Sequence, residues 1–151
     1  MDQGPSQKSP ELRISRSYPV PPEKVWRAWT DPQALSRWFG PGDPNSVTRA
    51  RLDVQAGGEF DIAFRMPDGQ EHNVGGVYQE VVPLRKLVFT WAWKSTPERV
   101  SLVTVELAPV AGGTQLDFLH TRFFDAESAT NHGRGWTATF VKLDAALASA
   151  T

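Results

Sequence analysis

Large apolar residues alternate with polar ones through the middle of the chain, from Val47 to His120, as Phe60, Ile62 and Phe64 illustrate. A period of two places alternate side chains on the same face of a β-strand. Clusters of Gly, Pro and Asp interrupt the pattern at short intervals, which is typical of an antiparallel meander. Together with an alternating segment at Leu12–Tyr18, the pattern predicts one sheet of about six strands.

Two short helices are predicted between the first strand and the meander. Pro22 favours the first turn of a helix that continues through Trp29, because the N–H that proline lacks has no intrahelical partner there. Asp31 followed by Pro32 repeats this start signal, since an N-cap carboxylate accepts a hydrogen bond from a free backbone N–H. Gly40 then ends the second helix.

A longer helix is predicted over Asn131 to Ala148. Its apolar residues recur at i, i+4, i+7 and i+11, which is the spacing of one helical stripe. These residues are Trp136, Phe140, Leu143 and Leu147. Gly133 and Gly135 weaken its first turn, because glycine loses more backbone freedom in a helix than other residues do. We expect this helix to form one wall of an apolar enclosure.

The composition describes an ordinary small domain. The 151 residues fit a single core, and we expect a disordered polar tail over residues 1–11 and one domain over residues 12–151. Sixteen Lys and Arg against seventeen Asp and Glu leave a net charge of −1, so nothing indicates nucleic acid or an anionic membrane as a partner. Without cysteine there are no disulfides or thiolates. With no signal peptide and no run of about 18 apolar residues, we expect a cytoplasmic protein.

Several short segments together resemble one protein family. They are Val20–Pro32, Arg37–Pro41, Gly57-Gly58, Gly76-Val77 with Glu80-Val81, Arg85–Trp91, Val103–Leu107 and His132 with Gly135-Trp136. In this order, over roughly Arg13 to Leu147, the chain resembles the heat-shock protein 90 ATPase activator homologues, within the START-like or SRPBCC superfamily. Six Trp and eight Phe beside two Tyr add an excess of large rings with little polar character.

The resemblance implies an α+β helix-grip fold of the START-like or Bet v-like kind. In that fold a curved antiparallel sheet wraps around the C-terminal helix and leaves a cavity between them. The superfamily includes lipid carriers, hormone receptors, aromatic cyclases and hydroxylase subunits, so fold alone does not select an activity.

The candidate ligand-binding residues are mostly aromatic, because cavities of this kind are lined by apolar rings with a few polar groups. Those expected along the cavity are Phe64, Met66, Trp91, Trp93, Phe118, Trp136 and Phe140, with Trp38 and Phe39 near its rim. The alternative is that these rings simply fill the core.

His120 shares the inward parity of its strand, and His132 precedes the stripe of the long helix, so the two could meet at the cavity mouth. Either could orient a polar ligand group or act as acid or base, or be satisfied by backbone like other buried histidines. The three histidines lie far apart without HxH or HExxH spacing, and no nucleophile motif is present. We therefore predict no catalytic residue, metal or cofactor.

Glycine pairs offer no phosphate loop, because neither GxxxxGK[ST] nor GxGxxG occurs. Gly75 and Gly76 lie within a predicted strand and indicate a bulge that lets the sheet curl. The segment Thr121–Asn131, with Phe123 and Phe124, is a candidate lid over the cavity.

The leading interpretation is non-enzymatic binding of a small hydrophobic or aromatic molecule between sheet and helix, by a monomer or homodimer. One alternative is a stress-related interaction module that binds a chaperone or regulator protein. Another is a cyclase- or hydrolase-like enzyme that uses the same pocket, for which the sequence offers no mechanism.

Overall fold

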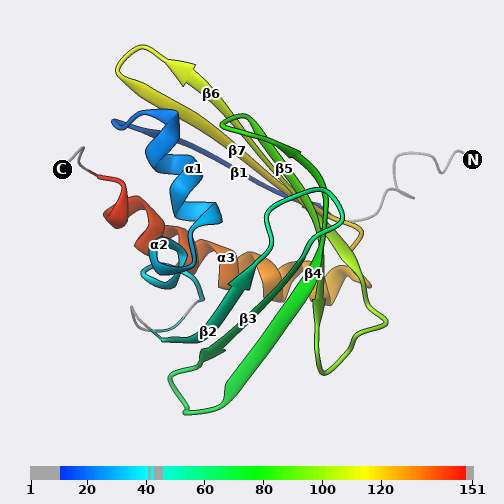
Figure 1. Cartoon of the computed structure of the whole chain (residues 1–151). Helices are drawn as coiled ribbons and strands as arrows, with labels where there is room; N and C mark the ends of the chain where they lie inside the picture. The colour runs from blue at the N-terminus through cyan, green and yellow to red at the C-terminus, as the bar shows by residue number, and fades with distance from the viewer. Residues whose placement is uncertain (1–10, 41, 43–45, 149–151) are drawn as a thin grey trace, which may run out of the picture.

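The computed structural model describes residues 11–40, 42 and 46–148 (Figure 1). Most of the predicted tail, residues 1–10, lies outside this described part. The elements in chain order are β1 (Leu12–Tyr18), α1 (Pro22–Thr30), α2 (Pro32–Ser36), β2 (Val47–Leu52), β3 (Glu59–Arg65), β4 (Glu71–Val82), β5 (Lys86–Trp93), β6 (Ser101–Val110), β7 (Gly113–Thr121) and α3 (Ala126–Ala146).

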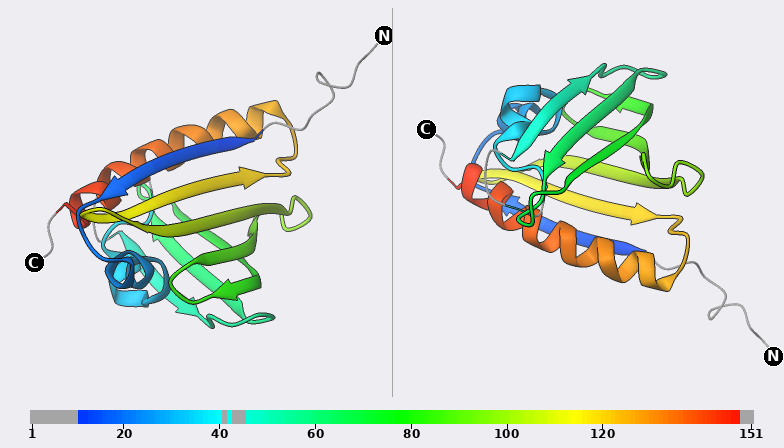
Figure 2. Two further views of the ribbon diagram at one scale, coloured as in Figure 1. Left: turned by 90° about the horizontal axis from the view of Figure 1, so that it is seen from above. Right: turned by 90° about the horizontal axis from the view of Figure 1, so that it is seen from below.

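The strands form one antiparallel sheet in the order β1-β7-β6-β5-β4-β3-β2. Neighbours in the chain are neighbours in the sheet from β2 to β7, and β1 adds to β7 with Ile14 opposite Phe118. The sheet curls around α3, while α1 and α2 close one end (Figure 1 and Figure 2). The predicted helix-grip fold is therefore confirmed, with seven strands rather than about six.

The bulge predicted at Gly75 and Gly76 is wrong. The pairing of β4 with β3 runs without interruption through both glycines, and the register with β5 shifts between Tyr78 and Glu80. The glycine at position 76 has another cause: a Cβ there would lie 1.9 Å from the carbonyl oxygen of Thr90. Gly76 thus permits a close approach of two backbones.

Side-chain caps begin α2 and α3, whereas α1 begins at Pro22 without a side-chain cap. Asp31 accepts a hydrogen bond from the Gln33 N–H at 3.0 Å and starts α2, as predicted. The start predicted for the long helix is wrong, because α3 begins at Ala126 rather than Asn131. Asp125 accepts from the Ser128 N–H at 2.8 Å, and this cap offsets the cost of the two glycines further along the helix.

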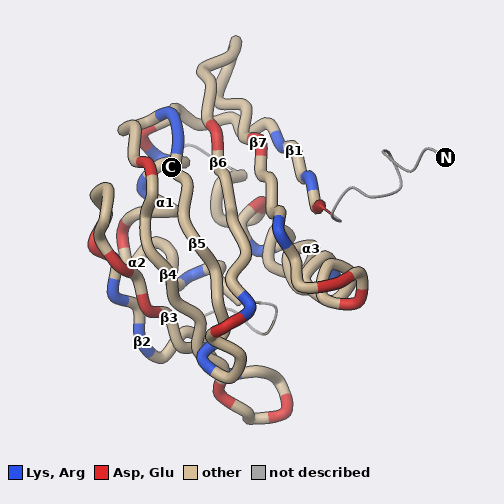
Figure 3. The backbone as a smooth tube through the Cα atoms, turned by 90° about the vertical axis from the view of Figure 1, so that its right-hand side faces the viewer, with Lys and Arg blue, Asp and Glu red and all other residues tan. Residues whose placement is uncertain are grey.

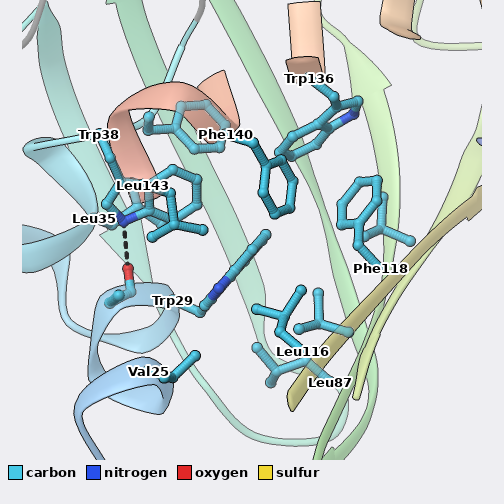
Figure 4. Close-up of a cluster of buried hydrophobic side chains, with 14 of the residues drawn as sticks. Val25, Trp29, Leu35, Trp38, Leu87, Leu116, Phe118, Trp136, Phe140 and Leu143 are labelled. Carbon is cyan, nitrogen blue, oxygen red and sulfur yellow. Dashed lines mark hydrogen bonds between the residues drawn. The ribbon is translucent and has the colours of Figure 1, made fainter. Parts of the chain in front are cut away.

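The core fills the end of the interior that α1 and α2 cover (Figure 4). Trp29 packs against Trp38 with ring centroids 4.7 Å apart, and the Trp38 indole N–H donates to the Ala28 carbonyl at 2.9 Å. Phe140 and Leu143 of α3 are fully buried beside them. No helix in the described part of the chain is long and apolar enough to cross a membrane.

Replacing Gly76 with Ala should lower the free energy of unfolding by about 2 kcal/mol, because the new methyl group would collide with the Thr90 carbonyl. Urea denaturation monitored by circular dichroism measures this. Gly133→Ala is the matched control. A Cβ there meets only a Leu12 methyl at 3.8 Å, so this variant should gain up to about 1 kcal/mol from helix propensity. Equal effects at both positions would contradict the proposed close approach.

Candidate functional site

A cavity of about 600 Å³ lies between the sheet and the N-terminal half of α3. Its floor comes from β3, β4 and β5, and its rim from the loops that follow β5 and β7. The lining residues are Phe39, Gly40, Phe64, Met66, His72, Trp91, Trp93, Ser95, Thr96, Arg99, Ser101, Phe123, Phe124, Ser128, Asn131, His132, Arg134, Gly135, Trp136 and Thr139.

The walls are built of rings that support each other. Trp91 lies 5.1 Å from Trp136 and 5.6 Å from Trp93, centroid to centroid. Phe64 contacts Phe39 at 5.7 Å and Trp93 at 5.9 Å. Because each ring is held by neighbours in tilted or edge-on contact, the cavity is formed without a ligand.

The face that α3 turns to the cavity carries small and polar residues. Ser128, His132, Gly135 and Thr139 all line it, at spacings of four, three and four residues. A Cβ at Gly135 would meet no heavy atom within 4 Å, so the helix leaves open space there. The empty volume therefore results from side-chain size along one helical stripe.

Hydrogen bonds use both ring nitrogens of His120, which is fully buried. The Trp136 indole N–H donates to Nδ1 at 3.1 Å. This assigns the proton of the neutral imidazole to Nε2, which donates to Ser101 Oγ at 2.7 Å. The Ser101 hydroxyl donates in turn to the Trp91 carbonyl at 3.2 Å. His120 thus joins β5, β6, β7 and α3 behind the cavity wall.

Burial lowers the pKa of His120 to about 3, and the neighbouring His132 ring, 5.3 Å away, adds to the effect. An imidazole with so low a pKa has little proton affinity near neutrality. Its Nε2 also carries a proton toward Ser101 instead of accepting one. The Ser101–His120 pair therefore lacks both features that activate a serine nucleophile.

His132 connects the helix to the sheet at the cavity wall. Its Nδ1 donates to the Ser128 carbonyl at 2.7 Å, and its Nε2 accepts from the Trp93 indole N–H at 2.9 Å. Burial lowers the pKa of His132, and the bond to Ser128 opposes this shift only in part. Among residues 11–40, 42 and 46–148, no three His, Asp or Glu side chains gather as metal ligands would.

The structure divides the sequence-predicted site residues into two groups. Those along the cavity are Phe39, Phe64, Met66, Trp91, Trp93, His132 and Trp136. Those buried outside its lining are Trp38, Phe118, His120 and Phe140.

Sequence reasoning omitted polar and small lining residues, among them Ser101, Arg99, Arg134, Gly135 and Thr139. A stripe of small residues at helical spacing was the available signal for Gly135 and Thr139. No comparable pattern in the sequence indicated Arg99 and Arg134. Which residues lie at the rim depends on how the loops and α3 meet in the folded structure.

The segment predicted as a lid is shorter than expected, because α3 already begins at Ala126. Phe123 is buried against His120, with ring centroids 4.3 Å apart. Phe124 is 61% exposed, and the Arg99 guanidinium lies 3.9 Å above its ring. Both aromatic residues line the cavity.

Comparison with known proteins places this geometry in context. The sequence matches the family described as "Activator of Hsp90 ATPase homolog 1-like protein" over residues 19–148. No curated protein matches the chain.

Among solved structures, the chain is similar to protein CV1439 from Chromobacterium violaceum at 29% identity and a TM-score of 0.80, with 92% of this chain and 98% of that chain covered. It is also similar to the AHSA1 protein from Silicibacter pomeroyi at 27% identity and a TM-score of 0.77, with coverages of 90% and 96%. Family and fold support a ligand-binding or interaction module in general.

The imidazole of His120 should remain neutral, with its proton on Nε2, from about pH 8 down to about pH 4. Nitrogen chemical shifts in a pH titration by NMR measure both the charge and the tautomer. Titration near the ordinary value of 6.5 would contradict the buried network.

This shift also makes stability depend on pH. Since the folded pKa of about 3 lies below the unfolded value of 6.5, the contribution of His120 is complete above pH 6.5 and is lost as the pH falls toward 3. The variant His120→Gln keeps a donor and an acceptor but does not titrate. Its free energy of unfolding should therefore fall less steeply below pH 6.5 than that of the unmodified protein.

Proposed function

The chain belongs to the Activator of Hsp90 ATPase homolog 1-like family, and we propose that it binds a small hydrophobic or aromatic molecule, non-covalently, in the cavity beside α3. The observation that carries this proposal is the cavity itself. Its volume of about 600 Å³ lies within the range of roughly 300–1,000 Å³ that small-molecule sites occupy.

The chemistry of the walls favours an apolar ligand with at least one ring. Phe64, Trp91, Trp93 and Trp136 offer ring faces and edges from both the sheet and the helix. Aromatic pairs add about 0.5–1.5 kcal/mol each beyond the burial of area. Because these rings already pack against one another, their side chains would lose little conformational freedom when a ligand binds.

The polar groups of the wall support binding without turnover. Both nitrogens of His120 and both nitrogens of His132 are engaged in hydrogen bonds, and burial keeps both rings neutral. A catalyst would require one of them to release its partner and gain basicity. The enzyme alternative thus finds no support in the hydrogen bonds around this cavity.

Filling the cavity should abolish ligand binding. Gly135→Phe places a ring in the open space beside Gly135, where a Cβ meets no heavy atom within 4 Å. We expect the neutral fluorophore N-phenylnaphthylamine to bind the unmodified protein and to bind Gly135→Phe at least about tenfold more weakly. Fluorescence titration measures both affinities.

Gly133→Ala is the control, because it changes the neighbouring helical glycine outside the lining. It should bind the probe like the unmodified protein. Thermal unfolding of all three proteins shows whether each remains folded. Undiminished binding to a folded Gly135→Phe would refute ligand carriage in this cavity. In parallel, native mass spectrometry of the purified protein should reveal any small molecule that it retains.

A further inference from the structure

The rim of the cavity differs in charge from its interior. Arg99, in the loop between β5 and β6, and Arg134, on α3, both line the cavity and are both exposed. No Asp or Glu occurs among the lining residues that the structure describes. Acidic and basic residues are otherwise interspersed along the chain (Figure 3). The two fully charged side chains that line the cavity are therefore both positive.

Within residues 11–40, 42 and 46–148, neither arginine forms a salt bridge. Arg99 packs on the Phe124 ring, 3.9 Å from its centroid, which holds the guanidinium beside the cavity. Asp125 lies close enough for Arg99 to contribute to lowering its pKa, but its carboxylate caps α3 through the Ser128 N–H.

The indole N–H groups of the cavity wall are buried or already bonded. Trp91 lines the cavity, and its indole N–H is buried without a hydrogen-bond partner in the described part of the chain. The other wall indoles, Trp93 and Trp136, donate to the two histidines. None of these three N–H groups is therefore open to a ligand, and recognition of a polar group depends on the rim of the cavity.

From these observations we propose that the ligand is an aromatic molecule with an acidic group, which lies at the rim between Arg99 and Arg134 while its rings enter the cavity. This inference rests on the proposed function and specifies the ligand class. Guanidinium groups bind carboxylates and sulfonates through charge-assisted hydrogen bonds. At the rim, the acidic group of the ligand would stay partly in contact with water. Its binding would therefore avoid the full free-energy cost of burying a charge.

Two probes with the same ring system separate this inference from the function on which it rests. Anilinonaphthalene sulfonate carries an acidic group, and N-phenylnaphthylamine is its neutral parent. We expect the anion to bind more tightly than the neutral probe at low salt. The double variant Arg99→Gln/Arg134→Gln should weaken the anion about tenfold, since an exposed charge pair contributes about two- to fivefold, and should leave the neutral probe within about twofold.

The matched control is Arg51→Gln, which removes an exposed positive charge on β2 outside the lining. It should leave the affinities of both probes unchanged. The preference for the anion should also decline as salt is raised, because counterions screen exposed charges. Thermal unfolding of each variant confirms that it is folded.

The outcomes differ for the two claims. If the neutral probe binds in the cavity but the anion binds no tighter, or if its advantage survives the double arginine change, the acidic ligand class is wrong and the binding cavity stands. If neither probe binds the unmodified protein, or if Gly135→Phe binds both as well as before, the cavity is not a binding site and both proposals fail.

Discussion

The packing of Trp136 determines where the interior of this domain is solid and where it is hollow. Its ring lies 4.5 Å from Phe118 and 5.1 Å from Trp91, and its N–H is bonded to His120 at 3.1 Å. These contacts hold the helix at a set distance from β5 and β7. One turn further along α3, Phe140 is fully buried among the core rings, whereas Gly135 leaves open space beside it on the side of the cavity.

Two adjacent stripes of residues on α3 account for the difference between the solid and the hollow part of the interior. One stripe is the buried set Trp136, Phe140, Leu143 and Leu147, of which only Trp136 also lines the cavity. The other stripe lines the cavity at the same spacing and consists of Ser128, His132, Gly135 and Thr139. A helix is stiff, so it cannot bend toward the sheet where its residues are small while Trp136 holds it away. Empty space therefore persists at one end, although close packing of apolar surfaces would be favourable there.

Much of the fold could be predicted from the sequence because it depends on local regularities. These regularities are the alternation in β3 and β5, the cap at Asp31 and the apolar stripe of α3. Each depends only on residues that lie close together in the sequence. The prediction missed the start of α3 because the apolar stripe begins only at Trp136, whereas the helix begins ten residues earlier, after the cap at Asp125. The supposed bulge at Gly75 and Gly76 failed for another reason. Glycine marks both bulges and close backbone approaches, and only the position of Thr90 distinguishes them.

The candidate site was less predictable, since it depends on long-range contacts. The alternation of β7 correctly placed His120 in the interior, yet its bonds to Ser101 and Trp136 come from separate elements. Aromatic composition indicated the kind of wall, but not which rings face open space. Trp38 and Phe118 are as apolar as Trp91, and they lie outside the lining because α1, α2 and α3 cover them.

The cost of burying polar groups explains the hydrogen bonds of the histidine behind the apolar cavity wall. The imidazole of His120 in an apolar wall is stable only when both nitrogens are satisfied, and Trp136 and Ser101 satisfy them. These hydrogen bonds offset the free-energy cost of burying the imidazole. They also occupy the lone pair and the proton that acid–base catalysis would need. Under the proposed function, discrimination among ligands would depend on the shape of the ring-lined space and on the side chains at its rim.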